Sequence, residues 1–530
     1  MSNQSDSSRF SGLFSDRRTL LKHMGLLAIG TAPISLAGCA TSTAAQTGSA
    51  APTVKSMVRR EDTTRNLGGM GFGYQSTWGA DGRAYVMVND GAGWADPATE
   101  FFNARMWAVR GDVENAQFSE ISNFPSLSYA TRPREAPRYF GIGLLAVRER
   151  IYQFLNTLDR AEDRPRHWTG AKLIYSDDNG LTWFNQDGST PVIWQDWGEQ
   201  SREHFAFFNE PDNCFSMLSI LQMGRNYSAN RDGYIYVYGL NGNVDGLMNQ
   251  LVMYRVPIAD MLDRSSYEYF SGWHSSGAPL WNKDIAARSP VHVFPRGWVN
   301  DTNLFPGDLV VESWLPSVVY NEALGVYMMA NAGIGCGPDG TEFGKPSYLG
   351  FWVSDTPWGP WRQVHEETAW TPGNDPASRA YVPRIMPQWI APDGKSFWLA
   401  WSDIKGIREF GRDEALMTEA LAKAKTPQEH SDIELDFLRR YMPGMRMNIQ
   451  RVDLNCVFDP YRSSIMRLRP GAIRPADQKP GLLSRPMMPP PAICGITFLF
   501  RQATLSPARR TERLSPDMVI SFSFPLSRRP

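Results

Sequence analysis

Residues 176–183 read SDDNGLTW, and this stretch decides the fold. Its residues have the spacing that a tight turn between two strands requires. Asp178 can accept hydrogen bonds from backbone N–H groups, Gly180 can adopt a positive φ, and Trp183 can pack beneath the turn. The stretch therefore predicts a β-hairpin whose turn is fixed by its own side chains.

The same eight residues fit the pattern S-x-D-x-G-x-T-W at every position, and so resemble the Asp-box of sialidases and other β-propellers. In those proteins the box lies away from the catalytic centre. We therefore take it as an indication of fold and not of chemistry. A weaker echo, SDTPWGPW, occurs at residues 354–361.

Strand-like runs alternate with turn residues on both sides of this motif, from Gly73 to about Asp403. They are rich in β-branched and aromatic residues, are bounded by Gly, Asp or Asn, and lack a helical period. Three similar segments, which begin at Trp78, Asn230 and Trp389, place an Asp-Gly turn before an aromatic strand. Irregularly spaced hairpins of this kind predict an all-β fold, a β-propeller with inserted loops, and a β-sandwich is the alternative.

The pattern changes to helix-forming residues between Gly411 and Tyr441, where two successive helices are expected. Thr426, Pro427 and Glu429 provide a capping hydroxyl, a first-turn proline and a glutamate three residues after the cap for the second helix. A closing strand is predicted at residues 445–454. The helices form either a small insert near the C-terminal end of the propeller or a lid.

The first 39 residues resemble a twin-arginine export signal, with Arg17 and Arg18 ahead of an apolar run that is too short for a membrane-spanning helix. The run ends in LAGC, which resembles a lipobox and predicts lipidation at Cys39; cleavage beside a chance cysteine is the alternative. Residues 40–60 are expected to be a flexible tether. The sequence thus predicts an exported, periplasmic or cell-surface protein that engages the twin-arginine translocase and contacts the membrane only through a lipid anchor.

Two further segments complete the predicted organisation, a β-propeller domain at residues 61–454 and a tail at residues 455–530. The tail is rich in Arg and Pro, poor in acids and without periodicity. Such a composition offers no obvious core. We expect it to be disordered or aberrant, as a shifted reading frame would produce.

Composition limits the classes of function. A formal net charge of −1 argues against nucleic-acid binding, which normally requires a basic face. The 18 tryptophans and 19 tyrosines fit short strands, and aromatic rings also stack on sugars. The plainer explanation for many aromatics is the core of a propeller or sandwich.

The chain lacks the usual signatures of metal, esterase and kinase chemistry. Its five cysteines show no CxxC spacing, and neither HExxH, G-x-S-x-G nor a phosphate-binding glycine loop is present. We therefore expect no metal site and no cofactor. A bridge between Cys214 and Cys336 would be chemically allowed in an oxidising compartment.

Several separated motifs occur in the order found in one family. They are residues 218–242 (LSILQMGRNYSANRDGYIYVYGLNG), 256–273 (VPIADMLDRSSYEYFSGW), 317–329 (SVVYNEALGVYMM) and 354–361 (SDTPWGPW). The region from Leu67 to Leu454 resembles the bacterial family catalogued as domain of unknown function 4185. The resemblance implies a five-bladed β-propeller and glycoside hydrolase activity, since some members are endo-D-arabinanases.

The resemblance carries over to the site only in part. Family enzymes place one aspartate before the first strand and a second at its end, and Asp90 occupies the second place. The first place falls at residues 74–77 (YQST), which contain no carboxylate. This departure favours a non-catalytic protein over a hydrolase, and Asp81 lies nearby in a turn.

A glycosidase needs one carboxyl group that donates a proton and one carboxylate that attacks or activates water. We predict Asp90 as the base, Glu312 as the acid and Asp232 as the charge that tunes or orients them. Glu210 and Asp403 are further candidates at strand ends. A turn-capping or salt-bridged carboxylate is the plainer interpretation of each.

The predicted substrate-binding residues are Trp78, Tyr227 and Trp314, which would stack on sugar rings, and Arg225, which would bridge a sugar hydroxyl or pair with Asp232. Core packing is the plainer role for each aromatic. The leading hypothesis is an exported glycoside hydrolase that cleaves an extracellular polysaccharide, such as arabinan. The alternatives are a non-catalytic, glycan-binding surface lipoprotein and a propeller that serves as a protein-interaction platform.

Overall fold

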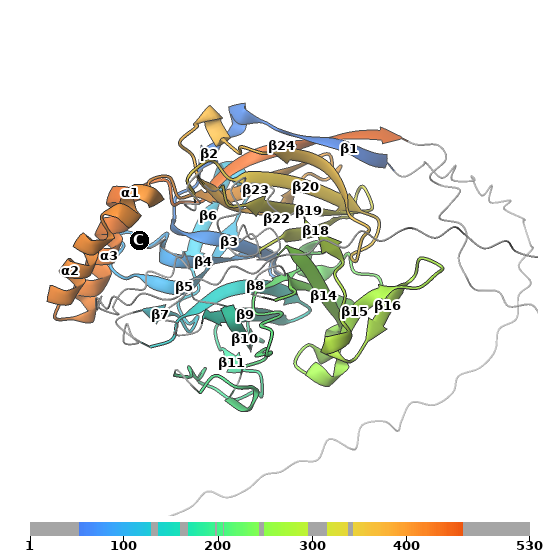
Figure 1. The fold of residues 1–530 in the computed structure, drawn as a ribbon, viewed down its shortest axis with the longest axis horizontal. Helices are drawn as coiled ribbons and strands as arrows, with labels where there is room; N and C mark the ends of the chain where they lie inside the picture. The colour runs from blue at the N-terminus through green and yellow to red at the C-terminus, as the bar shows by residue number, and fades with distance from the viewer. Residues whose placement is uncertain are drawn as a thin grey trace, which may run out of the picture. The chain divides into compact units, whose positions relative to one another are not determined.

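Five antiparallel sheets make up the described part of the chain (Figure 1). The computed structural model describes residues 52–128, 136–158, 168–196, 199–204, 206–242, 249–294, 315–335, 337 and 343–458. The predicted signal, most of the predicted tether and nearly all of the predicted tail lie outside these residues, as does Cys39. None of the described helices is both long and apolar enough to cross a bilayer.

The sheets follow one another along the chain, and we call them blades 1 to 5. Blade 1 contains β3 (Met70–Trp78), β4 (Ala84–Gly93), β5 (Phe102–Arg110), β6 (Gln117–Glu120) and the short β7 (Leu127–Ser128). Blade 2 contains β8 (Tyr139–Val147), β9 (Arg150–Leu158), β10 (Trp168–Ser176) and β11 (Phe184–Asn185). Blade 3 contains β12 (Leu218–Ile220), β13 (Tyr234–Leu240), β14 (Gln250–Pro257), β15 (Glu268–Trp273), β16 (Pro279–Asn282) and β17 (His292–Val293).

Blade 4 contains β18 (Ser317–Asn321), β19 (Val326–Gly333), β20 (Tyr348–Ser354) and β21 (Arg362–Glu367). Blade 5 contains β22 (Ala380–Ile390), β23 (Ser396–Asp403), β24 (Asn448–Phe458), β1 (Pro52–Arg59) and the short β2 (Arg65–Asn66). The 3₁₀ helices are η1 (Glu61–Thr63), η2 (Val113–Asn115), η3 (Arg202–His204), η4 (Arg225–Tyr227), η5 (Ile258–Asp260), η6 (Arg264–Ser266), η7 (Ile285–Ala287) and η8 (Pro372–Asn374).

The first strands of the blades form a closed ring, because β3 contacts β8, β8 contacts β12, and the series continues through β18 and β22 back to β3. Hydrogen bonds cross from blade to blade within this ring. The Ala146 N–H donates to Thr77 Oγ1 over 2.8 Å, and the Ile385 N–H donates to Ser317 Oγ over 2.9 Å. The predicted all-β, five-bladed propeller is confirmed.

Both ends of the described chain close blade 5. Strand β1 pairs antiparallel with β24, from Pro52 opposite Phe458 to Arg59 opposite Val452. Residues 52–59 were expected to belong to the tether, but Val54 and Met57 are buried in the core. Composition does not indicate this short strand, because the residues just before it are rich in Ser, Thr, Ala and Gly.

The C-terminal insert is helical, as predicted, but it contains three helices where two were expected. They are α1 (Ile407–Arg412), α2 (Glu414–Lys423) and α3 (Pro427–Tyr441). The capping box of Thr426 and Glu429 is present. Figure 1 shows the helices grouped beside β4 and β5, where Gln428 Nε2 donates to the Thr99 carbonyl oxygen in the loop between those strands.

The SDDNGLTW turn has the predicted geometry. Asp178 Oδ1 accepts from the Thr182 N–H over 2.8 Å, and Trp183 Nε1 donates to the Gly180 carbonyl oxygen over 3.1 Å. Gly180 has a φ of 91°, and Trp183 is buried against Phe124. The motif holds the outer edge of blade 2 together.

Candidate functional site

The ring has two ends, and the predicted site residues divide between them. In each blade the first strand turns into the second at one end, which we call the hairpin face; Trp78 opposite Ala84 marks it in blade 1. At the other end, which we call the loop face, the first strands begin and the second strands finish. The insert of α1 to α3 follows β23 and therefore lies on the loop face.

Asp90 lies at the loop face, near the end of β4, and its side chain is fully buried. Asn103 Nδ2, on the neighbouring β5, donates to Asp90 Oδ1 over 3.0 Å. Asp90 Oδ2 has no hydrogen-bond partner among the described residues. The structure therefore presents one anchored and one unsatisfied oxygen on a buried carboxyl group.

The burial of Asp90 changes its acidity. Removal from water raises its pKa from 3.8 to about 7, and the Asn103 hydrogen bond and the positive charge of Arg138 oppose this rise. A carboxyl group with such a pKa can hold a proton or release it near neutral pH. It has the acidity that a general acid or a general base requires.

The backbone around Asp90 is held in an uncommon conformation. Asp90 has a φ of 43°, in the left-handed region, and the pairing of β3 with β4 shifts register on either side of Phe72. The adjacent Asn89 exchanges two hydrogen bonds with the backbone of Gly141, 2.7 Å and 3.2 Å long. These bonds tie β4 to the first strand of blade 2 and so fix the position of Asp90.

Residues 74–77, where the resemblance implied an earlier aspartate, are used for packing in this chain. Tyr74 is buried, and its hydroxyl donates to the Gly71 carbonyl oxygen over 2.9 Å. Gln75 Oε1 accepts from the Gly143 N–H, and Thr77 accepts from Ala146 as described above. Gln75 and Thr77 thus join blade 1 to blade 2, and residues 74–77 contain no carboxyl group.

Asp232 lies on the hairpin face, at the turn that precedes β13. Its Oδ1 accepts from Asn230 Nδ2 over 3.0 Å and from the Tyr234 N–H over 3.1 Å, and its Oδ2 accepts from the Tyr236 hydroxyl. These contacts are those of a turn-capping carboxylate. The six steps from Ala84 to Asp90 alone span roughly 20 Å of strand, so the structure does not bring Asp232 and Asp90 together.

Three of the predicted substrate-binding residues also lie at the hairpin face or within the core. Trp78 ends β3 beside the turn, and Arg225 Nη2 donates to the Ala80 carbonyl oxygen in that turn. Tyr227 is only 3% exposed, and its hydroxyl donates to the Tyr234 carbonyl oxygen over 3.2 Å. None of the three faces Asp90, and the ring of Tyr227 is covered.

Two of the remaining candidates, Glu312 and Trp314, lie outside the described residues. The others have structural contacts. Glu210 forms a 2.5 Å ion pair with Arg264, and both side chains are largely buried. Asp403 accepts from Ser378 Oγ over 2.7 Å and caps a turn. Cys214 is a buried, free thiol.

Sequence reasoning overlooked Asn103, Arg138 and Arg384. Asn103 and Arg138 approach Asp90 only because β5 and β8 lie beside β4. Arg384, on β22, is buried and donates to the carbonyl oxygens of Gly73 and Leu315, each over 3.1 Å, so it joins blades 1, 4 and 5. Burial lowers its pKa to about 9. No local sequence motif indicates any of these contacts.

Possible metal ligands do not gather in the described residues, where no group of three or more His, Cys, Asp or Glu side chains is placed to hold an ion.

Comparison with known proteins gives fold similarity only. No family model and no curated protein sequence matches the chain. A putative hydrolase from Bacteroides ovatus is 13% identical, with 77% of this chain and 90% of that chain covered, at a TM-score of 0.38.

Two further solved structures have similar values. The GH62 α-L-arabinofuranosidase catalytic domain of Coprinopsis cinerea is 10% identical, covers 76% of this chain and 97% of its own, and has a TM-score of 0.32. The endo-arabinase of Bacteroides thetaiotaomicron is 13% identical, with 65% and 92% covered and a TM-score of 0.33. Scores this low assign no activity to the chain.

Proposed function

We propose that the chain is an exported glycoside hydrolase that cleaves an extracellular polysaccharide, with Asp90 as the group that exchanges a proton with the substrate or with water. The single observation that supports this function best is the buried carboxyl group of Asp90, with its pKa near 7 and one unsatisfied oxygen. Buried carboxyl groups with raised pKa values are typical of acid–base catalysis.

A glycosidase needs a second carboxyl group, and Glu312 fills this role in the proposal. The segment that carries it precedes Leu315 and β18, whose start lies on the loop face, the same face as Asp90. Asp232 is placed on the other face and does not enter the mechanism proposed here. The resemblance to domain of unknown function 4185 and the export pattern favour an arabinan-type substrate outside the cytoplasm.

The test is a glycan-degradation screen of the purified full-length protein against arabinan, arabinogalactan and xylan, with new reducing ends as the readout. Asp90→Asn and Glu312→Gln should each abolish the signal. Asp232→Asn is the matched control, since it changes a carboxylate on the hairpin face and should leave turnover intact. Activity that survives in Asp90→Asn would remove Asp90 from the mechanism.

A second function, a non-catalytic glycan-binding lipoprotein, is favoured by the absence of a carboxyl group at residues 74–77. It predicts retained glycan binding with no new reducing ends for the unmodified protein. The same screen, combined with binding to immobilised glycans, separates the two functions.

A further inference from the structure

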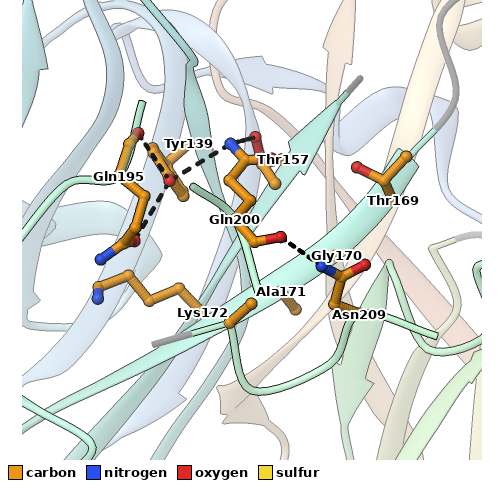
Figure 2. Close-up of a pocket in the computed structure, with 10 residues that line it drawn as sticks. Tyr139, Thr157, Thr169, Gly170, Ala171, Lys172, Gln195, Gln200 and Asn209 are labelled. Atoms are coloured by element: carbon orange, nitrogen blue, oxygen red, sulfur yellow. Dashed lines mark hydrogen bonds between the residues drawn. The ribbon is translucent and has the colours of Figure 1, made fainter. Parts of the chain in front are cut away.

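The candidate site is closed in the described conformation. Asp90 has no exposed surface, although the proposed function requires its carboxyl group to contact a sugar or a water molecule. Two cavities among the described residues give no access to it. One lies beside β10 (Figure 2) and the other beside β19 and β22; each has room for about one water molecule, and Asp90 lines neither. A polysaccharide can therefore reach Asp90 only after part of the loop face moves.

The end of the helical insert lies close to Asp90. Met445, which follows the insert, accepts a hydrogen bond from the Gly71 N–H over 3.1 Å. Gly71 in turn packs against both neighbours of Asp90 in β4. A Cβ at Gly71 would lie 2.6 Å from the Asn89 carbonyl oxygen, and a Cβ at Gly91 would lie 2.7 Å from Gly71 Cα. A movement of the insert would therefore begin one contact away from the strand that carries Asp90.

Two hydrogen bonds join the insert to the loop between β4 and β5, residues 94–101. Gln428 Nε2, in the first turn of α3, donates to the Thr99 carbonyl oxygen. Arg439 Nη2, near the end of α3, donates to the Ala98 carbonyl oxygen over 3.1 Å. We call this pair of bonds the latch. Both donor side chains are exposed, so water competes for the bonds and each contributes little to stability.

The insert can move as one body. Phe410 of α1 contacts Phe437 and Tyr441 of α3, and the Tyr441 hydroxyl donates to Asp413, between α1 and α2, over 2.8 Å. The two ends of the insert meet at a neck, where a Cβ at Gly406 would overlap the Tyr441 carbonyl oxygen. Gly406 has a φ of 94°, a conformation that glycine adopts without strain. A small residue at such a junction is typical of hinges.

We propose that the insert of α1 to α3 is a lid, which pivots at the neck, opens when the latch breaks and so admits a polysaccharide chain to Asp90. The proposal rests on the proposed function, because it concerns access to the same site. The described conformation is the closed form, in which bulk water is kept from the carboxyl group. Only the open fraction of the protein binds substrate, so the latch lowers the apparent affinity for glycan.

Carboxyl labelling with a water-soluble carbodiimide and glycine ethyl ester, read by peptide mass spectrometry, measures access to Asp90 without any need for turnover. In the unmodified full-length protein, Asp90 should be labelled slowly and the exposed Asp232 rapidly. The double variant Gln428→Met/Arg439→Met breaks the latch and should label Asp90 about tenfold faster, as the loss of two exposed hydrogen bonds predicts. Labelling of Glu367 in blade 4 should not change.

Single variants separate the latch from a general effect of mutating α3. Arg439→Met alone should label Asp90 about threefold faster, and Arg439→Lys, which keeps a donor, should stay closer to the unmodified protein. Arg440→Met is the matched control, because it removes the same charge from the next position but Arg440 pairs with Asp436 on its own helix. It should leave the labelling of Asp90 unchanged.

Three labelling results would overturn the lid. They are equal labelling of Asp90 in the unmodified protein and the double variant, an equal rise in Arg439→Met and Arg440→Met, and a rise at Glu367 together with Asp90 in every latch variant, which would indicate general loosening. Labelling of Asp90 as fast as Asp232 in the unmodified protein would also overturn it, because the site would already be open.

Turnover provides a second arm. On any polysaccharide that the glycan screen shows to be cleaved, the double variant should have a kcat/KM about tenfold higher than the unmodified protein, because its open fraction is larger. A latch that only supports the fold would lower kcat/KM instead, and that result would overturn the lid. If no polysaccharide is cleaved, the proposed function fails, while the labelling rates still decide whether the insert is a lid.

Discussion

Asn103 holds Asp90 through a 3.0 Å hydrogen bond from Nδ2 to Oδ1, between two neighbouring strands and out of contact with water. The bond fixes one oxygen and leaves the acidity of the carboxyl group to be set mainly by burial. It joins residues 13 positions apart in the sequence. Several properties of the protein should depend on this arrangement.

Asp90 should make folding less favourable as pH rises. Its pKa is about 7 in the fold and 3.8 when exposed, so the folded state binds the extra proton between these values. The contribution of Asp90 to the free energy of unfolding is therefore greatest below about pH 4 and falls as pH rises to 7. Asp90→Asn should remove this slope and raise the free energy of unfolding at pH 8 by about 2–4 kcal/mol.

Urea unfolding at pH 5 and pH 8 measures this effect. Asn tolerates a positive φ and keeps an oxygen for the bond from Asn103, so the variant should fold. An identical pH slope in the variant and the unmodified protein would show that Asp90 is ionised in the fold.

The two faces of the propeller should respond differently to mutation. Asp90→Asn should lower polysaccharide turnover by at least about 100-fold, as loss of a proton-transfer group does. Arg225→Ala should leave turnover within about twofold, because Arg225 contacts the Ala80 carbonyl on the hairpin face. A loss of turnover in Arg225→Ala with normal folding, measured by circular dichroism, would place substrate on the hairpin face.

An ion pair between blades 4 and 5 should protect the fold in acid. Arg59 on β1 donates to both carboxylate oxygens of Glu367 on β21, over 2.6 Å and 2.7 Å. Burial raises the pKa of Glu367, but hydrogen bonds from His365 and Arg59 outweigh it and bring the pKa to about 2. The stabilisation is present above about pH 4.5 and is lost as pH falls toward 2.

Arg59→Met should therefore cost about 1–3 kcal/mol at pH 7 and raise the pH of the acid transition. Arg60→Met is the matched control, because Arg60 pairs with Asp62 and Asp453 at the exposed surface and should cost little. Equal losses in the two variants would contradict a special role for the Arg59–Glu367 pair.

The Asp-box turn should be sensitive to a single methyl group. A Cβ at residue 180 would lie 2.7 Å from Ile121 Cγ2 and would force a side chain into a φ of 91°. Gly180→Ala should destabilise the protein by about 2–4 kcal/mol. Gly233→Ala, with a φ of 80° but no atom within 4 Å, should cost only about 1 kcal/mol. Thermal unfolding of both variants measures the difference, which isolates the clash from backbone strain.

The parts of the fold that are set by local sequence were predictable. The turn at residues 176–183 and the cap at Thr426 depend on side chains that contact their own neighbours in the chain. Strand β1 was not predictable in this way, because its burial depends on β24, about 400 residues away. The break at Asp413 between α1 and α2 was likewise not predictable, because no change in composition marks it.

The candidate site was less predictable than the fold. Asp90 and Asp232 both lie at strand ends beside aromatic residues, and only the family resemblance favours Asp90 as the base over Asp232. The register of β3 against β4 and the turn before β13 place them on opposite faces. The side chains that surround Asp90 come from β5 and β8, so its burial depends on contacts between strands and between blades.

The pairing of β1 with β24 also imposes a delay during synthesis of the chain, because the two strands are made at different times. Pro52 emerges early, but its partner Phe458 is made about 400 residues later. At ~5–20 residues per second, the first strand waits roughly 20–80 s for the last one. Blade 5 closes only after that interval, and until then β1 lacks the partner strand against which Val54 and Met57 are buried.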